Sequence, residues 1–148
     1  MQLIRKIFHR PAFIALIPPL GVIFDYTMTM FFSGGREAIL SLEYSPILRA
    51  AEASNLVIPC IAALAIGYYA LGYLALRSLA QTRFYTPGGL LLVLIGLTHA
   101  SGGLSWVVRN PAYSDAVILL AAAGVLVALA AFLLALRSPG PARRAQAL

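Results

Sequence analysis

Four long apolar runs, separated by short polar segments, dominate the pattern of this chain. They cover about Phe13–Ser33, Leu56–Leu76, Gly89–Val108 and Ala116–Leu136. Each run has the roughly 20 residues that a helix needs to cross the hydrocarbon core of a bilayer. The pattern therefore predicts an all-α fold: a polytopic membrane protein whose four-helix transmembrane bundle forms a single domain over residues 1–148, with a tail at 137–148.

Turn residues and charges close each run. The closing segments are Ser33-Gly34-Gly35-Arg36, Arg77, Arg109-Asn110-Pro111, and Arg137 followed by Pro139 and Pro141. The longest link, about Gly34–Asn55, joins the first two runs. Within it, Ser45 can cap a helix and Pro46 suits a first helical turn. A short helix over about Pro46–Asn55 is predicted in this first loop.

The basic residues are distributed unequally between the two ends of the spans. If both termini are cytoplasmic, the inside segments hold Arg5, Lys6, Arg10, Arg77, Arg83, Arg137, Arg143 and Arg144, whereas the outside loops hold Arg36, Arg49 and Arg109. Cytoplasmic loops of membrane proteins carry the excess of Lys and Arg. The sequence thus predicts a multi-pass protein of the cell (plasma) membrane with cytoplasmic N and C termini. The aromatic residues Tyr68, Tyr69, Tyr73, Phe84 and Tyr85 are expected at the inner interface, where aromatic belts form.

The first run also has an alternative interpretation, because basic residues before an apolar run are typical of a secretory signal. The run is long for a signal, contains an acid and two prolines, and has no Ala-x-Ala site after it. A retained span is therefore the prediction.

Composition and charge indicate which kinds of partner the protein binds. Only 11% of the residues are charged, and the net charge of +6 comes from basic residues at span ends. This placement favours membrane lipids with anionic headgroups over nucleic acid. Other membrane subunits, or a second copy of the chain, are also expected partners. The single cysteine, Cys60, excludes an internal disulfide, and no metal, phosphate or dinucleotide motif is visible, so no cofactor is predicted.

Asp25 is the one acidic residue inside an apolar run. A carboxylate near the bilayer centre costs about 2.5–3.5 kcal/mol on insertion scales, so such residues usually have a partner or a task. Thr29 lies one helical turn further on the same face. The two side chains could form an ion or proton site, or an anchor for a polar ligand. They could equally form interhelical hydrogen bonds that fix packing.

His99, in the third run, lies at a depth similar to that of Asp25. At 1.5 Å per residue, Asp25 is about 18 Å from Phe13 and His99 about 15 Å from Gly89. If the first and third spans touch, the two can pair and share a proton. The alternatives are that Asp25 meets Glu43 of the first loop or a residue of another chain.

Small residues recur at four-residue spacing, in Ala63-x3-Gly67, Gly96-x3-Ala100 and Gly124-x3-Ala128. This spacing allows close approach of helices within the bundle or between subunits.

The block from Phe24 to Arg49 also carries a resemblance to a known family. Its Asp25-x-x-x-Thr29, the Gly34-Gly35 turn and Glu43-x-Ser45-Pro46 resemble the pattern of the DUF5658-type family of small uncharacterised prokaryotic membrane proteins. Ser45 stands where that pattern has asparagine. The resemblance implies a prokaryotic source and a joint role for Asp25, Thr29, Glu43 and Pro46, and it carries no known activity.

Three functions follow from these residues. The first is a non-enzymatic accessory or structural subunit, or a homo-oligomer, with an intramembrane polar site at Asp25, Thr29, His99 and Glu43. The second is a small carrier or channel-like protein that binds a cation or proton at Asp25. The third is a membrane enzyme acting on a lipid or isoprenoid, for which Ser101 or Ser105 near His99 is the available nucleophile. No catalytic residue is assigned.

Overall fold

The structure, a computed structural model, describes residues 10–137. Its helices are α2 (Pro11–Ala15), α3 (Ile17–Phe32), α4 (Arg36–Leu42), α5 (Pro46–Ala53), α6 (Val57–Leu79), α7 (Tyr85–Val108) and α8 (Pro111–Arg137). Over the described residues there is no strand. The four membrane-length apolar stretches are Pro11–Phe32, Val57–Leu79, Tyr85–Val108 and Pro111–Ala131. The predicted all-α, four-helix transmembrane bundle is confirmed. Of the predicted tail at 137–148, Arg137 ends α8, and residues 138–148 lie outside the described residues.

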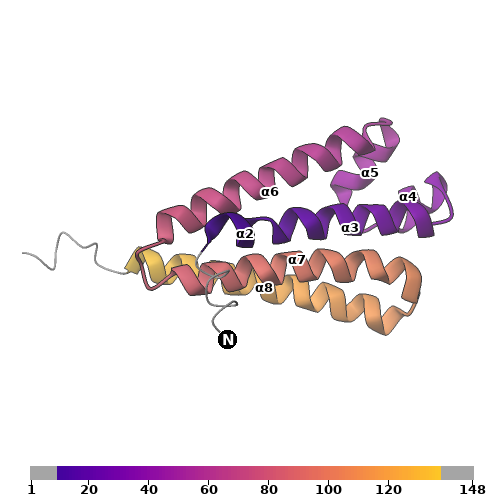
Figure 1. Ribbon diagram of the computed structural model, residues 1–148. Coiled ribbons are helices and arrows are strands. Elements are labelled where there is room, and N and C mark those ends of the chain that lie inside the picture. The colour runs from indigo at the N-terminus through magenta and orange to yellow at the C-terminus, as the bar shows by residue number, and fades with distance from the viewer. Residues whose placement is uncertain (1–9, 138–148) are drawn as a thin grey trace, which may run out of the picture.

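The first span is broken near its start by two prolines. Pro18 and Pro19 have no N–H groups to donate to the carbonyls of Ile14 and Ala15, so the helical ladder is interrupted there. The chain ends α2 at Ala15 and begins α3 at Ile17. The two pieces continue in the same general direction and together make one span (Figure 1).

Helix α3 packs most closely against α7, and glycines make this approach possible. A Cβ atom on Gly103 would lie 2.7 Å from the Cα of Asp25, and one on Gly96 would lie 2.6 Å from Cγ2 of Ile17. A Cβ on Gly21 would overlap the carbonyl oxygen of Gly96. The backbones are thus in direct contact over the length of the crossing, as small residues permit in membranes.

Of the three predicted small-residue motifs, the one in α7 supplies a close helix contact. Gly96 lies at the crossing with α3, whereas a Cβ on Gly67 would meet nothing within 4 Å. A Cβ on Gly124 would lie 3.6 Å from the side chain of Leu94, an ordinary van der Waals distance. The pair of contact glycines in α7, Gly96 and Gly103, is seven residues apart, two helical turns, and this spacing was not predicted.

The first loop folds into two helices that cover one end of the bundle, here called the α4–α5 end (Figure 1). Gly34 and Gly35 have φ angles of 87° and 127°, which glycine adopts without strain, and they reverse the chain after α3. The prediction of a helix starting at Pro46 is confirmed: the hydroxyl of Ser45 accepts a hydrogen bond from Leu48 N at 3.2 Å. This helix ends at Ala53, two residues before the predicted end.

Helix α4 was not predicted, because its seven residues are too few to show a periodic pattern. Polar and apolar contacts hold α4 and α5 against the end of the bundle. The Arg36 guanidinium donates to Asn55 Oδ1 at 2.7 Å and to the Ala53 carbonyl at 2.9 Å. Leu48 of α5 is fully buried against α3 and α6 in a cluster with Val22 and Tyr26.

Helix α8 begins five residues before the predicted start of the fourth run. Asn110 caps it by accepting from Ala112 N at 2.9 Å, and Pro111 fills its first position. The connection from α7 is made by Arg109, which has the left-handed backbone conformation. In Figure 1, α8 lies along α7 on the side away from α6. Much of its apolar surface, including Leu119 and Val125, is exposed.

Candidate functional site

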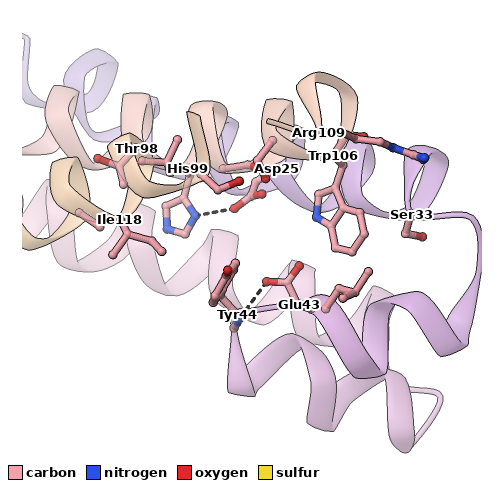
Figure 2. Close-up of a pocket in the computed structure, with 16 residues that line it drawn as sticks. Asp25, Ser33, Glu43, Tyr44, Thr98, His99, Trp106, Arg109 and Ile118 are labelled. Carbon is pink, nitrogen blue, oxygen red and sulfur yellow. Dashed lines mark hydrogen bonds and ion pairs between the residues drawn. The ribbon is translucent and has the colours of Figure 1, made fainter. Parts of the chain in front are cut away.

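Asp25 and His99 form a pair at the contact between α3 and α7. His99 Nδ1 lies 2.9 Å from Asp25 Oδ2, and the side chains of histidine and aspartate are 26% and 16% exposed (Figure 2). The neighbouring glycines make room for the acid, since a Cβ on Gly102 would lie 3.4 Å from both of its oxygens. The structure thus brings together the two residues that the sequence placed at similar depth.

A third residue extends the pair into a chain of hydrogen bonds. Tyr68 of α6 has its hydroxyl 3.2 Å from His99 Nε2, and the two rings meet edge to face with centroids 5.5 Å apart. Both imidazole nitrogens therefore have a partner. If Asp25 is ionised, Nδ1–H donates to it and Nε2 accepts from Tyr68; if Asp25 is protonated, both roles reverse. The chain can hold a proton at Asp25 or at His99 with every hydrogen bond kept.

The hydrogen-bonded residues Asp25, His99 and Tyr68 come from α3, α7 and α6, and each lies deeper from the α4–α5 end than the one before. Counted from the α4–α5 end of each helix at 1.5 Å per residue, Asp25, His99 and Tyr68 lie about 10, 13 and 16 Å deep. Tyr68 had been expected at the inner aromatic interface. It lies instead near the middle of α6, where its hydroxyl has His99 as a partner.

Thr29 does not join the pair. Its side chain is fully buried, and its hydroxyl donates to the backbone carbonyl of Asp25 at 3.0 Å, one helical turn earlier. Short hydroxyl side chains in helices commonly make this local bond to the backbone. Thr29 therefore shares a face with Asp25, as predicted, but it bonds the backbone rather than the carboxylate.

The pair lines a cavity of about 650 Å³ that extends to the α4–α5 end of the bundle. Asp25 and His99 form its inner part. Glu43 of the first loop, Trp106 of α7 and Arg109 also line it (Figure 2). Residues of α8, such as Ile118, close another side. Glu43, predicted as a site residue, thus faces the same cavity as Asp25.

Glu43 is held in a tight turn between α4 and α5. Its Oε1 accepts from Ser45 N at 2.8 Å. Burial raises the pKa of Glu43 above its usual value of 4.5, and the negative charge of Asp25 raises it further, while hydrogen bonds from the Ser45 backbone and the Trp106 side chain act in the opposite direction. Two of the five acidic residues of the chain therefore influence each other across one cavity.

The raised pKa of Glu43 predicts a pH-dependent stability. Because the folded state holds the Glu43 proton more tightly than the unfolded state, stability falls as pH rises from 4.5 through the folded pKa. Glu43→Gln removes this titration and keeps an oxygen for Ser45 N. We expect the melting temperature in detergent to fall more steeply over that window in the wild type than in Glu43→Gln. Parallel curves for the two proteins would contradict the prediction.

Arg109 ties the ends of two spans together. Its guanidinium donates to the carbonyls of Phe32 at 2.7 Å and Trp106 at 3.1 Å. Each bond satisfies one of the four terminal carbonyls of its helix, α3 or α7, which have no partner within the helix. The charge of Arg109 is thereby fixed at the mouth of the cavity, at the end opposite Asp25 and His99.

The sequence missed Tyr68, Trp106 and Arg109 as members of the site. Trp106 on α7 and Arg109, just after the end of α7, follow His99 at seven and ten residues, and this spacing was an available signal. Tyr68 had no such signal, because its partner is on another helix. In residues 10–137, no three His, Cys, Asp or Glu side chains are grouped as metal ligands.

Comparison with protein-family models gives no match, and comparisons with curated proteins and with solved structures give none either. The resemblance of Phe24–Arg49 to the DUF5658-type family therefore stays a prediction. What the fold and the site define is a class: a small integral membrane protein of four spans with a polar pair inside the bundle.

Proposed function

We propose that the protein binds a small ligand that is cationic or donates hydrogen bonds, and that it does so in the cavity lined by Asp25 and His99. This is the carrier-like function among those considered from the sequence. One observation supports it above the others: Asp25 has its partner within the same chain, and the pair still faces a cavity. The acid therefore needs no second subunit to be satisfied.

The hydrogen-bonding groups of the cavity favour a ligand that donates hydrogen bonds. Asp25 Oδ2 is engaged by His99, while no residue of the described chain donates to Oδ1 from a side chain. Two donors of the lining are already used: the guanidinium of Arg109 on backbone carbonyls, and the hydroxyl of Ser105 on the Gly102 carbonyl at 2.6 Å. A ligand that brings its own N–H or O–H groups complements this set.

The proposed setting is the plasma membrane of a prokaryote, with both termini cytoplasmic. The excess of Lys and Arg in the inside segments supports this orientation. The α4–α5 end of the bundle, and with it the mouth of the cavity, would then face the outside. In this setting lipids cover the exposed apolar surface, and the ligand enters from the outer side.

A second candidate is the accessory subunit or homo-oligomer. The observation in its favour is α8, which packs mainly on α7 and exposes residues such as Leu119 and Val125. Lipid or another chain can cover this surface. The enzyme with a serine nucleophile has less support, because the hydroxyl bonded to His99 is that of Tyr68, and Ser105 donates to a backbone carbonyl instead.

The binding of butylammonium, a small cation that donates hydrogen bonds, tests the proposal directly. Trp106 is the only tryptophan of the chain and lines the cavity, so its fluorescence reports occupancy. We expect butylammonium to bind the protein in nanodiscs, and Asp25→Asn to weaken binding about ten- to a hundredfold, since a hydrogen bond to a charged group contributes about 1.5–3 kcal/mol.

Asp115→Asn is the matched control, because Asp115 is exposed and lies outside the cavity lining. It should bind butylammonium as the wild type does. Equal affinity in the wild type and Asp25→Asn, or no binding to either, would overturn the proposal.

A further inference from the structure

The polar cavity continues into an apolar groove. This groove, of about 230 Å³, runs along α7, with residues of α8 on one side and Tyr68 of α6 at its inner end. It shares Thr98, His99 and Ala121 with the cavity, so the two meet at the Asp25–His99 pair. From there it follows Ile95 and Leu91 toward the other end of α7, a run of eight residues, or about 12 Å of helix.

The lining of the groove is apolar beyond its junction with the cavity. Its polar side chains, Tyr68, Thr98 and His99, lie at or near the junction and are satisfied: Tyr68 bonds His99, and the Thr98 hydroxyl donates to the Leu94 carbonyl at 2.9 Å. Water in such a groove, at bilayer depth, would find few partners. A hydrocarbon chain is the occupant that the surroundings favour.

Small residues on α8 create this space. Ala121, Gly124 and Ala128 line the groove at spacings of three and four, one face of a helix. Gly124 and Ala128 are the small pair that the sequence suggested for close helix contact. Here the short side chains leave room beside α7, and a larger side chain at Ala128 would occupy it.

We propose that the ligand is a single-chain amphiphile with an ammonium head, such as a long-chain amine. This inference rests on the function proposed above. Its chain would lie in the groove and its head at Asp25. The ammonium would meet Oδ1 of Asp25 directly and Glu43 across the cavity. The aromatic ring of Trp106 lines the same space, and aromatic rings attract alkylammonium groups.

The order of charges along the cavity favours a simple amine over a zwitterionic phospholipid. Outward from the groove, the lining presents Asp25 first and Arg109 last. In a phosphoethanolamine lipid the phosphate is nearer the chain and the ammonium is further out. That order would place phosphate against Asp25 and ammonium against Arg109, so each charge would be repelled. A simple amine has its positive charge next to the chain, which matches.

Ala128→Leu tests the groove separately from the head site. We expect it to weaken dodecylammonium binding, followed by Trp106 fluorescence in nanodiscs, about tenfold, because the added side chain fills space that the hydrocarbon would use. The ratio of the dodecylammonium to the butylammonium Kd is the readout. Ala130→Leu, two residues away and exposed outside the groove, is the matched control and should leave the ratio as in the wild type.

The outcomes separate the two proposals. If butylammonium binds in an Asp25-dependent way but Ala128→Leu and Ala130→Leu give the same ratio, the chain does not occupy the groove and this inference fails alone. If dodecanol or dodecyl phosphate competes as well as dodecylammonium, the ammonium head is wrong. If no amine binds, both proposals fail. A ratio changed by Ala128→Leu only, with competition by amines only, supports the inference.

Discussion

Removing either member of the Asp25–His99 pair is expected to destabilise the bundle, and removing both is expected to cost less than the sum. Each alanine variant leaves the other polar group inside the membrane without its main partner. We expect each single substitution to cost about 2 kcal/mol, with a coupling of about 1 kcal/mol or more between them. The coupling stays modest because hydrogen bonds between membrane helices contribute only about 0.6–2 kcal/mol.

The measurement is a double-mutant cycle of unfolding in bicelles with Asp25→Ala, His99→Ala and the double variant. A control cycle combines His99→Ala with Asp115→Ala, two positions that do not touch, and it should be additive. If the double variant of the pair costs the full sum as well, the 2.9 Å contact contributes nothing to stability. His99→Ala also frees Tyr68, so a larger cost for His99→Ala than for Asp25→Ala is consistent with the chain of three residues.

The four spans could be predicted because the membrane requires a helix of fixed length and apolar composition, and both are visible in the sequence as a continuous apolar run. The details at their ends could not. Helix α4 is one short element stabilised by tertiary contacts, including Arg36 with Asn55 at the far side of the loop. Asn110 and Pro111 carried the signal for the start of α8, but they were assigned to the end of the preceding helix.

The Asp25–His99 pair was one of three alternatives for Asp25, and the similar depth of the two residues on helices that run in the same direction made it possible. Side-chain direction was harder to infer. Thr29 was grouped with Asp25 by helical spacing, yet its hydroxyl bonds a backbone carbonyl. Tyr68 was grouped with interfacial aromatic residues by composition, yet it completes the site. Sequence spacing gives the face of one helix; it does not show which helix lies opposite.

The contact between α3 and α7 links packing to the site, and Gly103 is the contact glycine that lies directly against Asp25. A Cβ there would lie 2.7 Å from Asp25 Cα and 3.1 Å from the Asp25 carbonyl oxygen, both backbone atoms that cannot rotate away. We expect Gly103→Ala to force the helices apart and to cost about 1–3 kcal/mol of stability. The same displacement should lengthen the contact between His99 and Asp25, so amine binding at the cavity should weaken too.

Gly67→Ala separates this packing effect from the intrinsic effect of the substitution. Both glycines lie within long helices, where alanine is favoured over glycine by about 1 kcal/mol. At Gly67 an added Cβ would meet nothing within 4 Å, so this gain should appear undiminished as a higher stability in bicelles. The two variants should therefore shift stability in opposite directions. If Gly103→Ala is as stable as Gly67→Ala and binds butylammonium as the wild type does, the close crossing of α3 and α7 does not exist in the membrane. A loss of both stability and binding in Gly103→Ala alone would show that the glycines of α7 hold the acid and the histidine together.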